Sequence, residues 1–156
     1  MLLDHHWMLQ LVVIGQIILA MFLGGIIGFE RELANKPAGF RTHTLVAGAA
    51  AAFMGISRAA ADYYRPELGL HGVEMDLLRV AAAIVTGVSF LGAGTIFKDV
   101  GSGKVGGLTT AATIWVSAAV GMATALGQLL IALGLTLITL AVLRGMKWLE
   151  KTNGHG

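Results

Sequence analysis

Residues 22–42 read FLGGIIGFERELANKPAGFRT, an apolar segment with several glycines that ends in charged residues, turns and begins again. A shift of 68 residues aligns this stretch without a gap to residues 90–110, FLGAGTIFKDVGSGKVGGLTT, with seven identities in 21 positions. The identities include a Lys and a Thr, which a shared apolar composition does not explain. We interpret the match as an internal repeat, a recognised way of building membrane proteins. The alternative is coincidence in a chain rich in Gly and Ala.

The composition is that of an integral membrane protein. Hydrophobic residues make up 56% of the chain and charged residues 13%, whereas about a quarter of the residues are charged in a typical soluble domain. The chain has no cysteine, which excludes disulfides and thiolate metal sites. The basic residues are dispersed, so the net charge of +2 does not indicate a nucleic-acid-binding surface. We therefore expect a single transmembrane domain over residues 1–156.

The apolar stretches predict an all-α fold, a bundle of five transmembrane helices. The expected spans cover about residues 9–29, 42–62, 79–97, 107–122 and 126–146. Residues 105–143 contain no charge, but one helix of that length would extend about 58 Å, so we expect a bend near residues 121–128. Thr42 is the expected N-cap of the second helix.

The distribution of basic residues predicts the orientation in the membrane. Eight of the eleven Lys and Arg residues lie in the 30–41 turn, the 98–104 turn and the C-terminal tail. The positive-inside rule then places the N-terminus outside and the C-terminus in the cytoplasm. With five spans, helices 1–2 and 3–4 become parallel repeats about an axis along the membrane normal, and Lys36 and Lys104 lie on the same side.

Several small residues are expected to bring helices close together. Gly24 and Gly28 are four residues apart in the first span, and Thr113, Ser117 and Gly121 recur every four residues in the fourth. The glycines expected at helix contacts are Gly24, Gly28, Gly87, Gly92, Gly94 and Gly107. We place the third helix at the centre of the repeat pair, so replacing Gly92 or Gly94 with Leu is expected to destabilise the protein.

The turns on the predicted cytoplasmic side carry the candidate functional residues. They form a polar site near the repeat axis, with an anion-binding capacity from the helix N-termini; its residues are Glu30, Arg31, Lys36, Arg41, Thr42, Lys98, Asp99, Lys104, Thr109 and Thr110. The structural alternative is that Glu30 pairs with Arg41 across the turn while Lys36 contacts anionic headgroups. We predict the Glu30–Arg41 pair because an isolated charge near membrane depth is costly.

Asp76 and Arg79 lie three residues apart at the predicted outer end of the third helix, and so share one face. The structural interpretation is that Asp76 complements the helix dipole. The alternative is capture of a cation by Asp76 together with acids of the preceding loop, such as Glu74. No metal-binding signature, cofactor motif or nucleophile–base pair is present, so we expect neither a cofactor nor an enzyme.

Five motifs in order resemble the MgtC/SapB family: residues 28–31 (GFER), 36–42 (KPAGFRT), 76 with 79–82, 87 with 90–94, and 107–115. Thr109 departs from this pattern, since many relatives have Asn there. The resemblance implies a bacterial inner-membrane protein associated with adaptation to low magnesium and, in pathogens, with survival in host phagocytes. It also implies a larger membrane complex as partner, because some relatives are reported to act on the ATP synthase. We expect this chain to be the membrane core without the soluble C-terminal domain of longer members.

Two classes of function follow. The first is a regulatory or interaction protein that docks on a larger membrane complex within the lipid bilayer. The second is a small transporter or channel for a divalent cation such as magnesium, working as a homodimer. A dry core packed with Gly and Ala, with an apolar groove on the surface, would favour the first class; a polar cavity reaching the midplane would favour the second.

Overall fold

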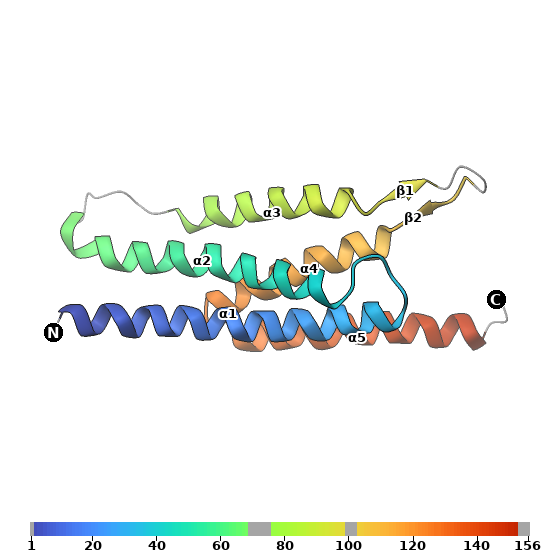
Figure 1. Cartoon of the computed structure of the whole chain (residues 1–156), viewed down its shortest axis with the longest axis horizontal. Coiled ribbons are helices and arrows are strands. Elements are labelled where there is room, and N and C mark those ends of the chain that lie inside the picture. Colours follow the sequence, from blue (N-terminus) through green and yellow to red (C-terminus); the bar gives the residue numbers. More distant parts are fainter. Residues whose placement is uncertain (1, 69–75, 99–102, 153–156) are drawn as a thin grey trace.

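The computed structural model describes residues 2–68, 76–98 and 103–152. In the described residues, five helices and one short hairpin follow one another along the chain (Figure 1): α1 (Leu2–Leu33), α2 (Phe40–Leu68), α3 (Leu77–Ala93), β1 (Phe97–Lys98), β2 (Val105–Gly106), α4 (Leu108–Ala125) and α5 (Leu129–Thr152). The predicted all-α bundle of five helices is confirmed. The antiparallel hairpin, which pairs Phe97 with Gly106, is a small addition that the sequence did not predict.

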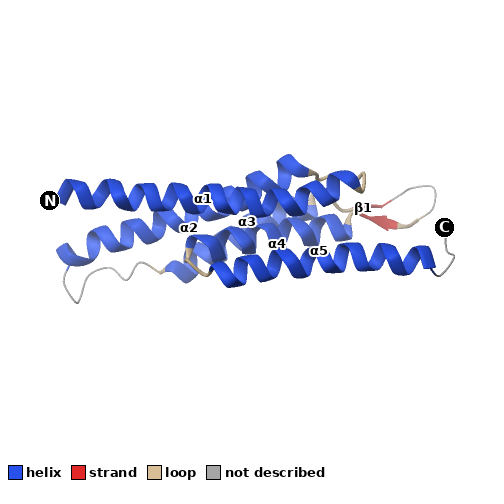
Figure 2. Cartoon of the chain, turned by 90° about the horizontal axis from the view of Figure 1, so that it is seen from below, coloured by secondary structure: helices blue, strands red, loops and turns tan. Residues whose placement is uncertain are grey.

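The helices lie along one common long axis and alternate in direction (Figures 1 and 2). The α1–α2 turn and the β1–β2 hairpin lie at the same end of the bundle, so Lys36 and Lys104 share one side as expected. The helix that contacts all four others is α4. The expectation that the third helix lies at the centre is therefore wrong: α3 packs against α2 and α4 on one side.

Three described helical segments are long and apolar enough to cross a membrane: Trp7–Leu33, Phe40–Asp62 and Leu108–Ala125. Leu77–Ala93 and Leu129–Gly145 are shorter apolar helices. The third helix ends at Ala93, four residues before the expected boundary, because the chain turns at Gly94 and enters β1. The bend between α4 and α5 falls where it was expected, with Gly127 in the left-handed region (φ 75°).

The turn between α1 and α2 is closed at both ends by specific hydrogen bonds. Asn35 adopts φ 53°, Asn35 N–H donates to Glu32 O and Lys36 N–H donates to Arg31 O, which is the Schellman ending of a helix. Glu32 then reaches forward, and its Oε2 accepts the Phe40 N–H at 2.9 Å. The predicted N-cap at Thr42 is therefore wrong, because α2 begins two residues earlier and is capped by a carboxylate from α1.

The internal repeat is reproduced only where the second helix of each half begins. The helices α2 and α4 start at Phe40 and Leu108, which are 68 residues apart. Residues 26–30 are helical in α1, however, whereas the equivalent residues 94–98 lie beyond α3, where the chain turns and forms β1. The predicted superposition of the two halves is therefore not confirmed.

The glycines expected at helix contacts differ in their surroundings. A methyl group on Gly24 would lie 2.5 Å from Ala47 Cβ, and one on Gly28 would lie 2.8 Å from Gly39 O, so α1 and α2 meet at backbone distance. Gly107 has φ 86° and faces Thr95 O at a distance that only glycine allows.

The three glycines of the α3 region are less crowded. Gly92 is buried against Ala111 with room for a methyl group at 3.6 Å. Gly87 and Gly94 are exposed, and no other helix lies within 4 Å of a methyl group placed on either. The expected packing roles of Gly87 and Gly94 are therefore wrong, because neither glycine is in contact with another described helix.

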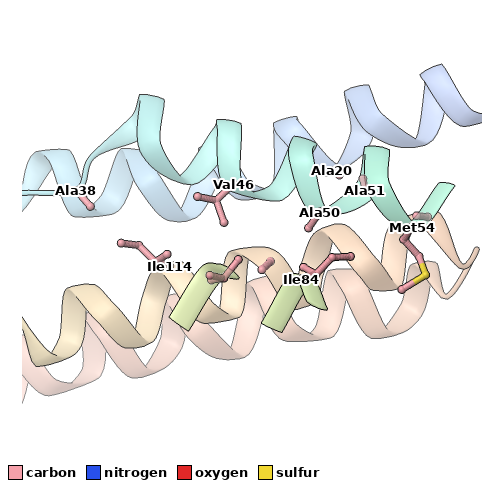
Figure 3. Close-up of a cluster of buried hydrophobic side chains, with 11 residues drawn as sticks. Ala20, Ala38, Val46, Ala50, Ala51, Met54, Ile84 and Ile114 are labelled. Atoms are coloured by element: carbon pink, nitrogen blue, oxygen red, sulfur yellow. The ribbon is translucent and has the colours of Figure 1, made fainter. Parts of the chain in front are cut away.

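The apolar core lies between α1, α2, α3 and α4, and its side chains are mostly small. Figure 3 shows Val46 and Ala50 projecting from α2, with Ile84 of α3 and Ile114 of α4 beside them. Ala51 is fully buried and Met54 is 1% exposed. Small side chains let these helices pack closely, which is the usual basis of helix association in a bilayer.

Candidate functional site

A cluster of buried polar side chains lies where the C-terminal end of α1 meets the N-terminal ends of α2 and α4. Its members are no more than 4% exposed: Glu30, Arg31, His43, Thr110 and Thr113. We call these five residues the buried polar cluster. Polar groups at membrane depth are costly unless they are paired, so their hydrogen bonds decide what the cluster can do.

Glu30 and Arg31 form an ion pair between consecutive residues of α1. Arg31 Nε donates to Glu30 Oε2 at 2.6 Å, and Arg31 Nη2 contacts the same oxygen. The predicted pair between Glu30 and Arg41 is wrong. Arg41 is exposed and forms no ion pair with any residue in the described part of the chain, because it lies on the outer face of α2.

His43 links three segments of the fold. Its Nδ1 lies 2.9 Å from Gly39 O, and its Nε2 lies 2.9 Å from Thr113 Oγ1 on α4. A carbonyl only accepts, so Nδ1 carries a hydrogen, and in the neutral ring Nε2 accepts from the Thr113 hydroxyl. Thr113 Oγ1 is also 2.9 Å from Thr110 O. A charged ring would instead donate from Nε2, and the Thr113 hydroxyl would then donate to Thr110 O.

The residues of the polar site predicted from the sequence fall into a buried group and an exposed group. Three of its residues, Glu30, Arg31 and Thr110, are buried in the cluster. Six are exposed around the same end of the bundle: Lys36, Arg41, Thr42, Lys98, Lys104 and Thr109. Asp99 lies outside the described residues. The two turns are thus brought to one end of the molecule, but most of their charges face outward and do not converge on one site.

Sequence reasoning missed His43, which is fully buried. The signal in the sequence is a polar ring one residue after Thr42, at the start of an apolar span. Ser117, one turn after Thr113, is also fully buried, and its hydroxyl has no hydrogen-bond partner in the described part of the chain. Among the residues that the structure describes, no group of three His, Asp or Glu side chains is placed to hold a metal ion.

The opposite end of the bundle carries two structural arginine contacts. Asp76 Oδ1 accepts the Arg79 N–H at 3.1 Å and caps α3, while Arg79 Nε lies 3.7 Å from Asp76 Oδ2. Arg58 donates from Nη1 to Ala125 O at 2.9 Å, at the C-terminal end of α4 where a cation is favoured. Asp76 therefore has the helix-capping role, and Glu74 lies outside the described residues.

An apolar groove runs between α2 and α3. It has a volume of about 780 Å³ and is lined by residues of both helices. Its floor is formed by the buried Val46, Ala50, Ile84 and Val88. The polar side chains in its lining are Ser57 and Arg79.

Comparisons with known proteins agree on one family. The model of the MgtC family matches residues 17–152. The chain is 42% identical over 128 residues to "Putative magnesium transporter YhiD" of Escherichia coli K12, which covers 82% of this chain and 57% of that protein. It is 45% identical over 123 residues to "Protein MgtC" of Brucella abortus, covering 79% and 46%.

A third relative is "Protein SrpB" of Synechococcus elongatus, 38% identical over 143 residues, covering 87% of this chain and 75% of that protein. The matched region spans about half the length of YhiD and of the Brucella MgtC protein, 57% and 46% respectively. No solved structure matches the chain.

Proposed function

This chain belongs to the MgtC family of membrane proteins, and we propose that it acts during growth at low magnesium by binding a larger membrane complex. The single observation that carries this proposal is the closed packing of α1, α2 and α4. A methyl group on Gly121 of α4 would lie 2.2 Å from Ala47 O of α2, and α1 approaches the same alanine at Gly24. Magnesium sheds water reluctantly, and this contact leaves no room for a hydrated ion.

The polar groups support the same proposal. Glu30 binds Arg31, and His43 is held between Gly39 and Thr113. Thr124 and Thr136 donate to carbonyls of their own helices, the usual behaviour of a hydroxyl that serves packing. These side chains therefore have partners within the protein, whereas the buried Ser117 hydroxyl has none among the described residues. The apolar groove between α2 and α3 likewise offers no ligands suited to a divalent cation along its length.

The remaining parts of the proposal concern partner and location. We place the chain in the bacterial inner membrane with its N-terminus outside, because most basic residues lie at the other end. The role is not enzymatic. The first partner to test is the proton-translocating ATP synthase, which the family resemblance implies.

The test is proton pumping by inverted membrane vesicles prepared from cells with and without this chain, at limiting magnesium. The proposal expects ATP-driven pumping to fall when the chain is present. In the matched variant Gly121→Leu, we expect that the protein does not accumulate in folded form. Proton pumping should then be the same as in cells without the chain. Unchanged pumping in cells whose growth at low magnesium depends on the chain would contradict the ATP synthase as partner.

The second candidate is a small transporter or channel for a divalent cation, acting as a homodimer. The observation in its favour is the buried ion pair of Glu30 and Arg31, since buried ionisable residues in membrane proteins often mark ion pathways. The name of the relative YhiD points the same way for that protein. Transport by purified protein separates the two functions.

A further inference from the structure

The groove between α2 and α3 has the length of one membrane leaflet. On α2 it runs from Leu45 to Ser57, which is about 18 Å of helix at 1.5 Å per residue. A single leaflet contributes about 15 Å of hydrocarbon. The groove exists because small residues face it: Ala49 on α2, and Ala83 and Gly87 on α3. A methyl group on Gly87 would meet no atom of the described residues within 4 Å, so this part of the groove is open.

A guanidinium lies at one end of the groove. Arg79 stands in the first turn of α3, and its side chain is 87% exposed. Its Nε is 3.7 Å from Asp76 Oδ2, and Asp76 is already engaged as the cap of the helix. The Ser57 hydroxyl at the same end donates to Phe53 O, which leaves its oxygen able to accept. The groove therefore combines an apolar channel with a cation at its water-facing end.

We propose that the α2–α3 groove binds an anionic phospholipid, with one acyl chain along the groove and the phosphate at Arg79. The charge supports this occupant, because a guanidinium pairs with a phosphate through parallel hydrogen bonds. The length supports it as well. A partner helix that crosses the bilayer would be about 30 Å long and would pass beyond a groove that ends at a charge. The Arg79 end of the groove lies at the end of the bundle where α1 begins, since Arg79 is in the first turn of α3.

The floor of the groove fixes how deeply the acyl chain lies. Val46 and Ala50 of α2 and Ile84 and Val88 of α3 are buried and belong to one core cluster, and Figure 3 shows Val46, Ala50 and Ile84 in this core. The acyl chain of the lipid would lie on these side chains, between the exposed Phe53 and Leu91. Filling the groove from Gly87 should therefore displace the lipid without disturbing the core beneath it.

The experiment is native mass spectrometry of the purified protein titrated with dioleoylphosphatidylglycerol or with dioleoylphosphatidylcholine. For the unchanged protein we expect at least a tenfold preference for the anionic lipid. Arg79→Gln should abolish that preference, while Arg41→Gln, an exposed arginine at the other end of the bundle, should keep it. Gly87→Leu should reduce binding of both lipids, and Gly87→Ala should reduce it less.

Three results would overturn the proposal. The first is an unchanged preference in Arg79→Gln. The second is unchanged lipid binding in Gly87→Leu when its elution profile matches that of the unchanged protein. The third is a dimer in the spectrum that Gly87→Leu converts to monomer, which would assign the groove to a second copy of the chain. Each result is independent of whether the chain acts on a membrane complex.

Discussion

His43 of α2 is joined through its Nε2 to the hydroxyl of Thr113 on α4, a 2.9 Å contact between residues 70 positions apart. The same ring is held from its other nitrogen by Gly39 O, in the turn that connects α1 to α2. The α1–α2 turn is thus tied to the central helix by a side chain with no exposed surface. This link positions the end of the bundle where the two predicted turns meet.

We predict that Thr113→Val destabilises the protein by about 1–2 kcal/mol, because valine keeps the shape but leaves a buried His43 nitrogen without its partner. Thr109→Val is the matched control, since Thr109 is exposed on the same helix, and should change the free energy of unfolding by less than about 0.5 kcal/mol. Thermal unfolding in detergent measures both. Equal effects of the two variants would show that the Thr113 bond contributes nothing.

The buried ion pair predicts a non-additive double-mutant cycle. Glu30→Gln removes the carboxylate that pairs with the buried Arg31 guanidinium, and should cost about 3–5 kcal/mol. Arg31→Gln removes the same bond from the other side, so the double variant should cost less than the sum of the two single variants. Arg41→Gln is the control, and the exposed position of Arg41 predicts an effect below about 0.5 kcal/mol. Additive single effects, or an Arg41→Gln effect as large as that of Arg31→Gln, would contradict the pairing.

Replacing two glycines with alanine should change the stability of the protein in opposite directions. Gly121→Ala places a methyl group 2.2 Å from Ala47 O and should destabilise by about 1–3 kcal/mol through overpacking. Gly87→Ala meets nothing within 4 Å and should stabilise α3 by up to about 1 kcal/mol, because alanine loses less backbone entropy in a helix. A melting temperature that falls equally for both variants would place α3 in closer contact than the structure has it.

The number and type of helices could be predicted from the sequence because a bilayer leaves few choices. Backbone groups must be satisfied within a span, so long uncharged stretches form helices. The 39 uncharged residues of 105–143 had to bend, and the bend lies at Gly127. The close approach at Gly24 and Gly28 also follows from their spacing. These features depend on local sequence and on membrane thickness, and both are known before folding.

The contacts of the site could not be predicted, since they depend on how each helix is rotated about its axis. Glu30 is flanked by two arginines in the sequence, Arg31 beside it and Arg41 across the turn, and spacing alone favoured the second. Rotation of α2 turns Arg41 outward and His43 inward. The early end of α3 is also a tertiary effect, because residues 97–98 pair with residues 105–106. The sequence repeat predicts the same structure in both halves and therefore does not predict this difference.

We propose that this protein works by binding within the membrane and does not carry magnesium across it. The most direct measurement is uptake of magnesium by liposomes that contain the purified protein, driven by a magnesium gradient and followed with a dye trapped inside. The account predicts uptake equal to that of liposomes without protein. Protein-dependent uptake that is saturable and is lost in Glu30→Gln, with that variant folded in the same liposomes, would contradict it.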